Sequence, residues 1–335
     1  MKVSELGEFG LIDLLSGIVY QAQDKETAAW QELILGMGDD AAAWRGDTSI
    51  QLATLDSLVQ GVHFTLETTS WEELGWKAMA VNLSDIAAMG GLPCYALVSL
   101  SLPGNTEVED VTALYRGMIK LGQQFEVAII GGNMSSSPLV SIDIVVLGST
   151  GSEEYILTRS AAKVGEEIAV TGYLGASAAG LEMLTKNLSF TAEAAAGLKK
   201  AFLQPYPRIV EGRMLVEHGV RSAIDISDGL LSDLRHICQA SKVGARVEIN
   251  RVPVQPAVKD NFGDRALELA LSGGEDYELL FTASSEVIDR VRKAVSCPVT
   301  VIGEVTGKAG EITLVDGKGN PVDLPETGWE HFTGK

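Results

Sequence analysis

An α+β fold built from two domains is predicted for this chain by three observations. Its 335 residues correspond to two domains of about 150 residues each. Segments with strand-like alternation and segments with helical periodicity are interleaved in both halves. The polar stretch TRSAAKVGEE (158–167) comes between them, and the strand–helix pattern starts afresh after it. We therefore expect an N-terminal domain over residues 1–150 and a C-terminal domain over residues 151–335.

The first half is predicted to run β–α–β–α–β–β. SIQLATLD (49–56) alternates apolar and polar residues, which predicts a strand that ends at Asp56. WEELGWKAMAVNLSDIAAM (71–89) has helical periodicity and is followed by the helix-ending pair Gly90–Gly91. The later elements are a strand at 94–102, a helix at 108–125, and strands at 127–130 and 141–148.

The second half mixes the same kinds of element. EIAVTG (167–172) predicts a strand, and two or three Ala- and Leu-rich helices follow, interrupted by Pro205 and Pro207. GLLSDLRHICQASK (229–242) predicts a helix. The remaining elements are a strand at 246–252, a strand at 278–284, a helix at 286–295 and a strand at 299–305.

The composition limits the class of partner and the location. A formal charge of −19 argues against nucleic acid or an anionic membrane as partner, because those surfaces attract Lys and Arg. A small anionic substrate stays compatible, since bound cations invert the local field. The chain shows neither a membrane-length apolar stretch nor a secretory signal, and its three cysteines lack CxxC spacing. We expect a soluble, cytoplasmic protein.

Two carboxylates interrupt the apolar stretch AIDISDGLL (223–231). Asp225 and Asp228 lie where a short strand ends, and Gly229 opens the next helix. A buried, unpaired carboxylate costs several kcal/mol. Ser227 or Asp228 could be the N-cap of that helix, which would leave Asp225 uncompensated. A salt bridge, a helix N-terminus or a metal ion must therefore compensate it.

Two acidic motifs come early in the chain. GMGDDAAAW (36–44) presents Asp39 and Asp40 after a glycine turn, and a turn capped by Asp is the simpler alternative. In ATLDSLVQGVHF (53–64), Thr54 and Asp56 share one face of a strand by the period of two. His63 follows, and a lone His is more often structural than functional.

A third acidic motif lies inside a predicted helix. AVNLSDIAAMGG (80–91) places Asp85 among apolar neighbours, with Asn82 and Val81 one turn before it. Neither neighbour can form an intrahelical ion pair, so a partner must come from elsewhere in the fold. A helix break capped by Ser84 is the alternative explanation.

Two glycine pairs stand beside polar side chains. IIGGNMSSSP (129–138) has a strand that ends in Gly131–Gly132, followed by Asn133, where backbone N–H groups can approach a phosphate. SGGEDYELLF (272–281) carries Glu275 and Asp276 ahead of a strand. Ordinary turns explain either pair when it is taken alone.

The motifs together indicate a Mg²⁺–phosphate site. Several carboxylates that converged without cations would repel one another, and Mg²⁺ prefers carboxylate, water and phosphate oxygens. The sequence has no His/Cys cluster typical of zinc sites and no GxxxxGK[ST] loop. This pattern predicts phosphoryl transfer by an enzyme without a P-loop.

The ordered series GDDAA, TLDSLVQGVHF, AVNLSDIAAMGG, IIGGN, LTRS, AIDISDGL, GGEDYEL, IGEV and GWEHF resembles the thiamine-monophosphate kinase family, within the aminoimidazole ribonucleotide synthetase and selenophosphate synthetase superfamily. The resemblance runs from Gly7 to Phe332. It implies ATP-dependent phosphorylation of thiamine phosphate to thiamine diphosphate by direct in-line transfer, the last step in making that product. It also implies two α/β domains of the superfamily type and a homodimer formed through the N-terminal sheet, with ATP near that interface.

The resemblance also assigns residues, with catalysis resting on positioning and charge neutralisation rather than on a general base. Trp329 would offer its aromatic face to the cationic thiazolium ring. The implied sets are Mg²⁺ ligands for several ions at Asp40, Thr54, Asp56, Asp85, Asn133, Asp225 and Asp228; ATP contacts at Tyr115, Gly131, Gly132, Arg159 and Ser227; and thiamine phosphate contacts at His63, Glu275 and Trp329.

Two positions depart from the family pattern. Asn133 stands where Asp is common, so one negative charge is lost while an amide oxygen remains. Leu55 stands where a second hydroxyl residue is common, which leaves only its backbone carbonyl as a ligand. The departures affect the number or affinity of metal ions and leave the predicted reaction class unchanged.

Two other hypotheses remain. Another ATP-dependent synthetase of the superfamily is one, although selenophosphate synthetases usually carry a reactive Cys near the N-terminus and the first Cys here is Cys94. A non-catalytic module that binds Mg–nucleotide is the other. The complete series of acidic ligands, Asp56 and Asp225 included, argues against such a loss of activity.

Overall fold

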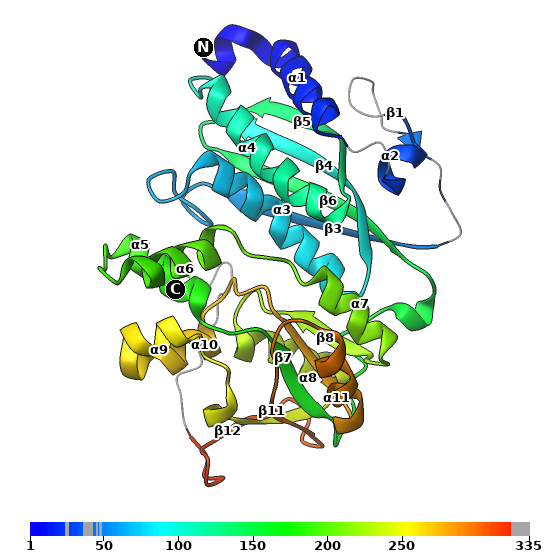
Figure 1. Ribbon diagram of the computed structural model, residues 1–335, viewed down its shortest axis with the longest axis vertical. Coiled ribbons are helices and arrows are strands. Elements are labelled where there is room, and N and C mark those ends of the chain that lie inside the picture. The colour runs from blue at the N-terminus through cyan, green and yellow to red at the C-terminus, as the bar shows by residue number, and fades with distance from the viewer. Residues whose placement is uncertain (24–26, 36–42, 45, 47–48, 323–335) are drawn as a thin grey trace. The chain divides into compact units, whose positions relative to one another are not determined.

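The computed structural model describes residues 1–23, 27–35, 43–44, 46 and 49–322. The chain divides into two compact units. Each unit combines a sheet with helices, which confirms the predicted α+β class (Figure 1). Unit 1 comprises Met1–Ile86 with Leu92–Ser152, and unit 2 comprises Ala87–Gly91 with Glu153–Lys335.

Unit 1 is a sheet with helices packed on it. Its described elements are α1 (Val3–Ala22), α2 (Ala28–Glu32), β1 (Leu33–Leu35), β2 (Ala43–Trp44), β3 (Ile50–Val59), α3 (Trp71–Ala88), β4 (Leu92–Leu102), α4 (Val108–Gly122), the 3₁₀ turn η1 (Gln123–Phe125), β5 (Ala128–Ser136) and β6 (Ser141–Thr150). The main sheet has the order β3-β6-β4-β5, in which β6 is antiparallel to both neighbours and β5 is parallel to β4. β1 and β2 form a separate short pair.

Helices α3 and α4 lie over one face of this sheet, and α1 packs against α4 (Figure 1). Glycines allow α3 and α4 to approach closely. A Cβ at Gly75 would overlap the carbonyl oxygen of Leu114, and a Cβ at Gly117 would overlap that of Glu72. Larger side chains at either glycine would therefore push the two helices apart.

The two faces of the unit 1 sheet differ in burial. On β6, Ile142, Ile144 and Val146 are fully buried on the helix-covered face. On β3, Leu55 and its neighbours two residues away lie exposed on the other face. Period-two alternation thus gives β3 one face toward the helices and one open face.

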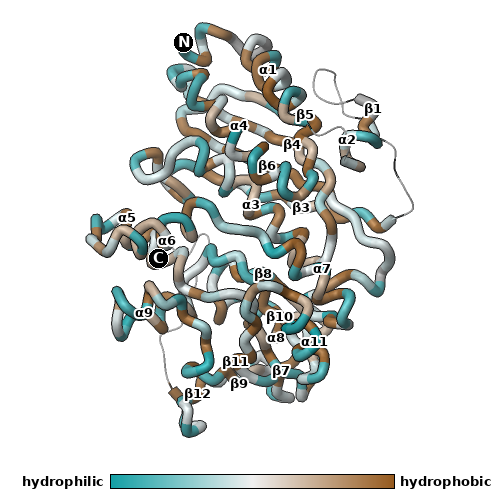
Figure 2. The backbone as a smooth tube through the Cα atoms, in the orientation of Figure 1, coloured by the Kyte–Doolittle hydropathy of each residue, from teal (hydrophilic) through white to brown (hydrophobic). Residues whose placement is uncertain are grey.

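Unit 2 is built on a larger sheet. Its described elements are η2 (Glu153–Tyr155), β7 (Glu167–Thr171), α5 (Ala176–Thr185), α6 (Ala192–Leu203), α7 (Ile209–Glu217), β8 (Ser222–Asp225), α8 (Leu230–Ser241), β9 (Gly244–Glu248), η3 (Ile249–Arg251), α9 (Pro256–Phe262), η4 (Gly263–Arg265), α10 (Ala266–Ser272), β10 (Leu279–Ala283), α11 (Ser285–Ala294), β11 (Val299–Thr306) and β12 (Ile312–Val315). The strand order is β12-β9-β11-β7-β10-β8, antiparallel except between β12 and β9. β8 and β10 are buried at every residue and β7 at all but its first, and hydrophobic residues are frequent along the strands of this sheet (Figure 2).

A buried ion pair anchors the start of β10. Arg208, just before α7, donates from Nε to a carboxylate oxygen of Glu278 at 2.7 Å and pairs with the other oxygen through Nη2. Thr171 Oγ1 at the end of β7 also donates to Glu278, at 2.6 Å. Because the carboxylate is largely buried and has several donors, its removal would leave Arg208 with only the longer contact to Glu211, at 3.8 Å, among its described ion pairs.

Most of the predicted helices and strands are confirmed within a few residues, but three strand predictions are wrong in extent. β3 continues past Asp56 to Val59, because its pairing with β6 continues to Ser141. β5 continues through the glycine pair to Ser136, because β4 pairs with it that far. The strand predicted at 246–252 is β9 over Gly244–Glu248, followed by the turn η3.

Several elements have no counterpart in the sequence predictions. The longest is α1, and the short elements α2, β1, β2, α9, α10 and β12 were also not predicted. Short elements carry too few residues for a clear period. Within the described residues, no helix combines the length and hydropathy needed to cross a membrane.

Candidate functional site

The AIDISDGLL stretch lies at the end of β8 in unit 2. β8 ends at Asp225, whose side chain is buried, and α8 begins two residues after Asp228. The helix N-cap is Gly229, at φ 118°, so the prediction that Ser227 or Asp228 caps it is wrong. Neither side chain is the cap, and Ser227 and Asp228 are both partly exposed.

A second loop, from the SGGEDYEL motif, runs beside the first. The N–H of Glu275 donates to Ser227 O at 2.8 Å, and the N–H of Tyr277 donates to Ile226 O at 2.9 Å. A Cβ at Gly274 would lie 2.5 Å from Ser227 O, so only glycine permits this approach. The structure thus brings the Asp225–Asp228 loop and Glu275 together.

The backbone of this second loop is strained. Glu275 and Tyr277 have φ values of 65° and 51°, in the left-handed region that side chains disfavour. Between them, the Asp276 carboxylate accepts N–H groups of Gly175 at 2.7 Å and Ser177 at 3.2 Å, at the start of α5. Desolvation raises the pKa of Asp276 to about 7, against the lowering effect of those donors. Asp276 is therefore a structural cap that holds the loop presenting Glu275.

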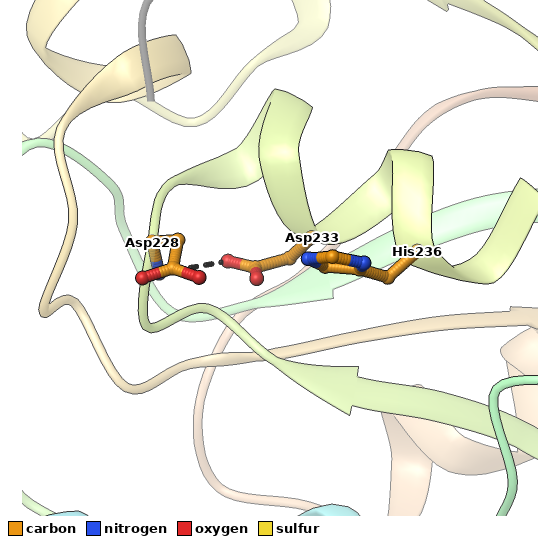
Figure 3. A group of neighbouring side chains, drawn as sticks. All are labelled: Asp228, Asp233 and His236. Atoms are coloured by element: carbon orange, nitrogen blue, oxygen red, sulfur yellow. Dashed lines mark hydrogen bonds between the residues drawn. The ribbon is translucent and has the colours of Figure 1, made fainter. Parts of the chain in front are cut away.

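Asp233, which the sequence analysis missed, is the hydrogen-bonding centre of the first loop (Figure 3). Its Oδ2 accepts the N–H groups of Ser227, Asp228 and Gly229 at 3.1, 3.2 and 3.1 Å. Desolvation, followed by repulsion from the Asp225 and Asp228 carboxylates, raises the pKa of Asp233 to about 8. The sequence feature that could have indicated Asp233 is its position in the first turn of a helix, shortly after the two acids Asp225 and Asp228.

The donor set around this loop fits a cation. Asp228, Asp233 and His236 each place a ligand atom within 4.8 Å of the others (Figure 3). Asp233 Oδ2 already accepts three N–H groups of the loop, and the charge of the buried Asp225 also acts on Asp233. Clustered carboxylate oxygens match the preference of Mg²⁺, and a cation would relieve their mutual repulsion.

Unit 1 gathers three predicted residues where β3 meets α3. The Thr54 hydroxyl donates to Oδ2 of Asp85, which is the partner from elsewhere in the fold that the helix pattern required. The N–H of Asp56 donates to Oδ1 of Asn82 at 3.0 Å, and Asn82 Nδ2 donates to Ala78 O at 3.1 Å. Asn82 is fully buried and was not predicted; its signal was its position three residues before Asp85.

Asn133 is not brought into this group. In the sheet order β3-β6-β4-β5, β6 and β4 lie between β3 and β5. At the usual strand spacing, β5 is therefore on the order of 14 Å from β3. The register pairs Asn133 with Ser99, in the row that faces away from the helices, whereas Asp56 faces them. A Cβ at Gly132 would overlap the carbonyl oxygen of Val98, so strand pairing alone already requires this glycine.

The other predicted residues are dispersed in the described structure. Tyr115 on α4 is 2% exposed, and burial raises the pKa of its hydroxyl strongly. Arg159 is exposed, and its carbonyl oxygen accepts Ser241 Oγ at 2.7 Å. His63 Nδ1 accepts the N–H of Val59 at 3.0 Å, which closes the turn after β3. Two predicted residues, Asp40 and Trp329, lie outside the described residues.

Comparison with known proteins matches both halves of the chain. Models of the AIR synthase related protein family, N-terminal and C-terminal domains, match residues 38–150 and 163–316. Thiamine-monophosphate kinase of Aquifex aeolicus (strain VF5) is 36% identical over 335 residues, which span 99% of this chain and 100% of that protein.

Solved structures agree with these matches. Thiamine-monophosphate kinase from Stenotrophomonas maltophilia K279a has a TM-score of 0.81 at 33% identity, covering 94% of this chain and 98% of that one. AaThiL complexed with AMPPCP and TMP has a TM-score of 0.77 at 33% identity, covering 99% of both chains. From its sequence and its fold alike, the chain belongs to the thiamine-monophosphate kinase family.

Proposed function

We propose that this protein transfers a phosphoryl group from ATP to thiamine phosphate, forming thiamine diphosphate and ADP. The observation that carries the proposal is the likeness, over 99% of both chains, to AaThiL complexed with the ATP analogue AMPPCP and with TMP. The acidic groups at β3–α3 and at β8–α8 supply the chemistry such a transfer needs. Because ATP is the phosphoryl donor, we propose the cytoplasm as the place of action.

The reaction needs positioning more than proton transfer. A phosphate oxygen of thiamine phosphate attacks the γ-phosphorus of ATP in line, and the bond to the bridging oxygen of ADP breaks. The attacking oxygen is already anionic, so this chain need not supply a general base. The strained loop at Glu275 and the hydroxyl of Ser227 are the groups we assign to holding the two substrates in register.

Mg²⁺ is the metal that fits the acidic side chains. Separate ions would be held through oxygen atoms alone, by Asp225 and Asp228 in unit 2 and by Thr54, Asp56 and Asp85 in unit 1. When bound, Mg²⁺ would neutralise charge on the phosphates. The chain's own contribution is to hold these acids in place before the substrates bind. The hydrogen bond from the Asp56 N–H to Asn82 Oδ1 is one example.

Product formation tests the proposal directly. The purified protein is mixed with ATP, Mg²⁺ and thiamine phosphate, and the products are separated by chromatography. We expect thiamine diphosphate and ADP, and neither product when thiamine replaces thiamine phosphate or when EDTA is present. Mg²⁺-dependent ATP binding without any product would instead favour a superfamily relative or a binding module.

We also propose a homodimer formed through the open face of the unit 1 sheet. Leu55 is 59% exposed there and lies in register with Val145, which is itself in register with Leu97. The row is exposed at Leu55, while Leu97 packs in a cluster with Trp30 and Leu33, and an exposed apolar side chain on a sheet face is typical of an interface. Asn133 lies on this same face and far from Asp56, so a metal site that used both residues would require a second chain.

Trp329→Ala tests the thiamine phosphate assignment. Loss of an aromatic face beside a cationic ring is expected to raise the KM for thiamine phosphate roughly tenfold while leaving the KM for ATP unchanged. Steady-state kinetics with each substrate varied in turn measure both constants. A change confined to the KM for ATP would reject Trp329 as a thiamine phosphate contact.

Asn133→Asp tests whether this position holds a metal. Restoring the missing negative charge is expected to lower the Mg²⁺ concentration for half-maximal activity several-fold. Asn187→Asp adds the same charge at an exposed site in unit 2 and serves as the control. Equal Mg²⁺ dependence in the two variants would place Asn133 outside the metal site.

A further inference from the structure

The loop that joins β8 to α8 has its backbone N–H groups already occupied. Ser227, Asp228 and Gly229 are consecutive, and all three N–H groups point to a single oxygen, Oδ2 of Asp233. Three successive N–H groups at a helix start form the concave anion site that commonly binds phosphate. Here a carboxylate of the same chain fills that site, with its side chain 1% exposed.

This arrangement gives the backbone and the side chains of Ser227 and Asp228 different tasks. The N–H groups of Ser227 and Asp228 are turned inward to Asp233, so a nucleotide phosphate cannot use them. The side chains of the same two residues remain partly exposed. Asp233 thus fixes the backbone of the loop through its N–H groups, and we assign the side-chain oxygens to a metal or a nucleotide.

We propose that Asp233 is a positioning residue for the metal-binding side chains of this loop. It sets the conformation of the loop that carries Asp228, just after Asp225 at the end of β8, and it excludes phosphate from the N-terminus of α8. The phosphates are then held at this loop through Mg²⁺ and not through direct contact with the helix. The inference rests on the proposed function, because it assumes that Asp225 and Asp228 bind Mg²⁺.

Two substitutions test this role. Asp233→Leu removes the acceptor at similar size, and Asp233→Asn keeps one acceptor oxygen while removing the charge. A residue that orients a metal ligand commonly changes metal affinity by about tenfold or more when it is lost. We expect Asp233→Leu to raise the Mg²⁺ concentration for half-maximal activity by about that factor, and Asp233→Asn by less. At saturating Mg²⁺, the KM for thiamine phosphate should be unchanged in both.

Ile237→Val is the control, because it loosens the buried packing of α8 and offers the loop no acceptor in either form. It should lower Tm and leave the Mg²⁺ dependence as it is. If Asp233→Leu behaves like Ile237→Val, Asp233 is only a helix cap and the inference is wrong. Should Asp233→Leu fail to fold, Asp233→Asn decides by the same comparison.

Mn²⁺ titration without nucleotide, followed by electron paramagnetic resonance, distinguishes failure of this inference from failure of the proposed function. Asp225→Asn is the reference variant. Weaker Mn²⁺ binding in Asp225→Asn, but not in Asp233→Leu, would overturn only the positioning role. Equal Mn²⁺ binding in wild type and Asp225→Asn would overturn the metal site itself, and the positioning role with it.

Discussion

Asp225→Asn is expected to lower kcat by about a hundredfold or more while leaving the fold intact. Asp225 is 3% exposed, at the end of β8, and its charge raises the pKa of Asp233 nearby. The substitution preserves size and removes one negative charge from a crowded acidic cluster. A cation held there would lose a charged ligand, so the transferring phosphoryl group would be less well neutralised.

The measurement is kcat at saturating ATP, Mg²⁺ and thiamine phosphate, with circular dichroism and Tm to check the fold. Without metal, Tm should be maintained or raised, because repulsion with Asp233 is relieved. Asp264→Asn, which neutralises an exposed acid of the same unit, should leave kcat unchanged. Normal turnover in Asp225→Asn would remove Asp225 from the metal site.

Leu55→Asp is expected to convert the proposed dimer into a monomer and to reduce activity strongly. Leu55 stands on the open face of the unit 1 sheet, opposite in direction to Thr54 and Asp56. A charge in the middle of an apolar interface row would have to be buried without a partner, which costs several kcal/mol. Activity should fall when dimerisation is lost, because Asn133 lies on this face and the family resemblance implies ATP near the interface.

Size-exclusion chromatography with light scattering measures the mass across a range of protein concentrations. Val164→Asp is the matched control, since Val164 is 61% exposed but belongs to unit 2. It should leave both mass and activity unchanged. A Leu55→Asp protein that stays dimeric and active would show that this sheet face is not the interface.

The sequence by itself determined the α+β class and most of the helices and strands. In α3, helical periodicity over eighteen residues and the following glycines are local properties, so the pattern defines the helix without its neighbours. The same holds for α8 and for the strands of alternating burial such as β6. The acidic motifs were also visible, because a carboxylate inside an apolar stretch contradicts its surroundings.

Only the tertiary structure decided where strands end and which acids meet. β3 and β5 extend beyond their predicted ends because neighbouring strands continue to pair with them, and strand pairing joins distant residues. Asn82 contacts Asp56 across 26 residues of sequence, a link that no local period encodes. Asp233 is closer, yet an acid in the first turn of a helix ordinarily faces solvent. The Asp233 side chain instead accepts hydrogen bonds from three backbone N–H groups. These bonds depend on the loop conformation, which the neighbouring Glu275 loop helps to hold.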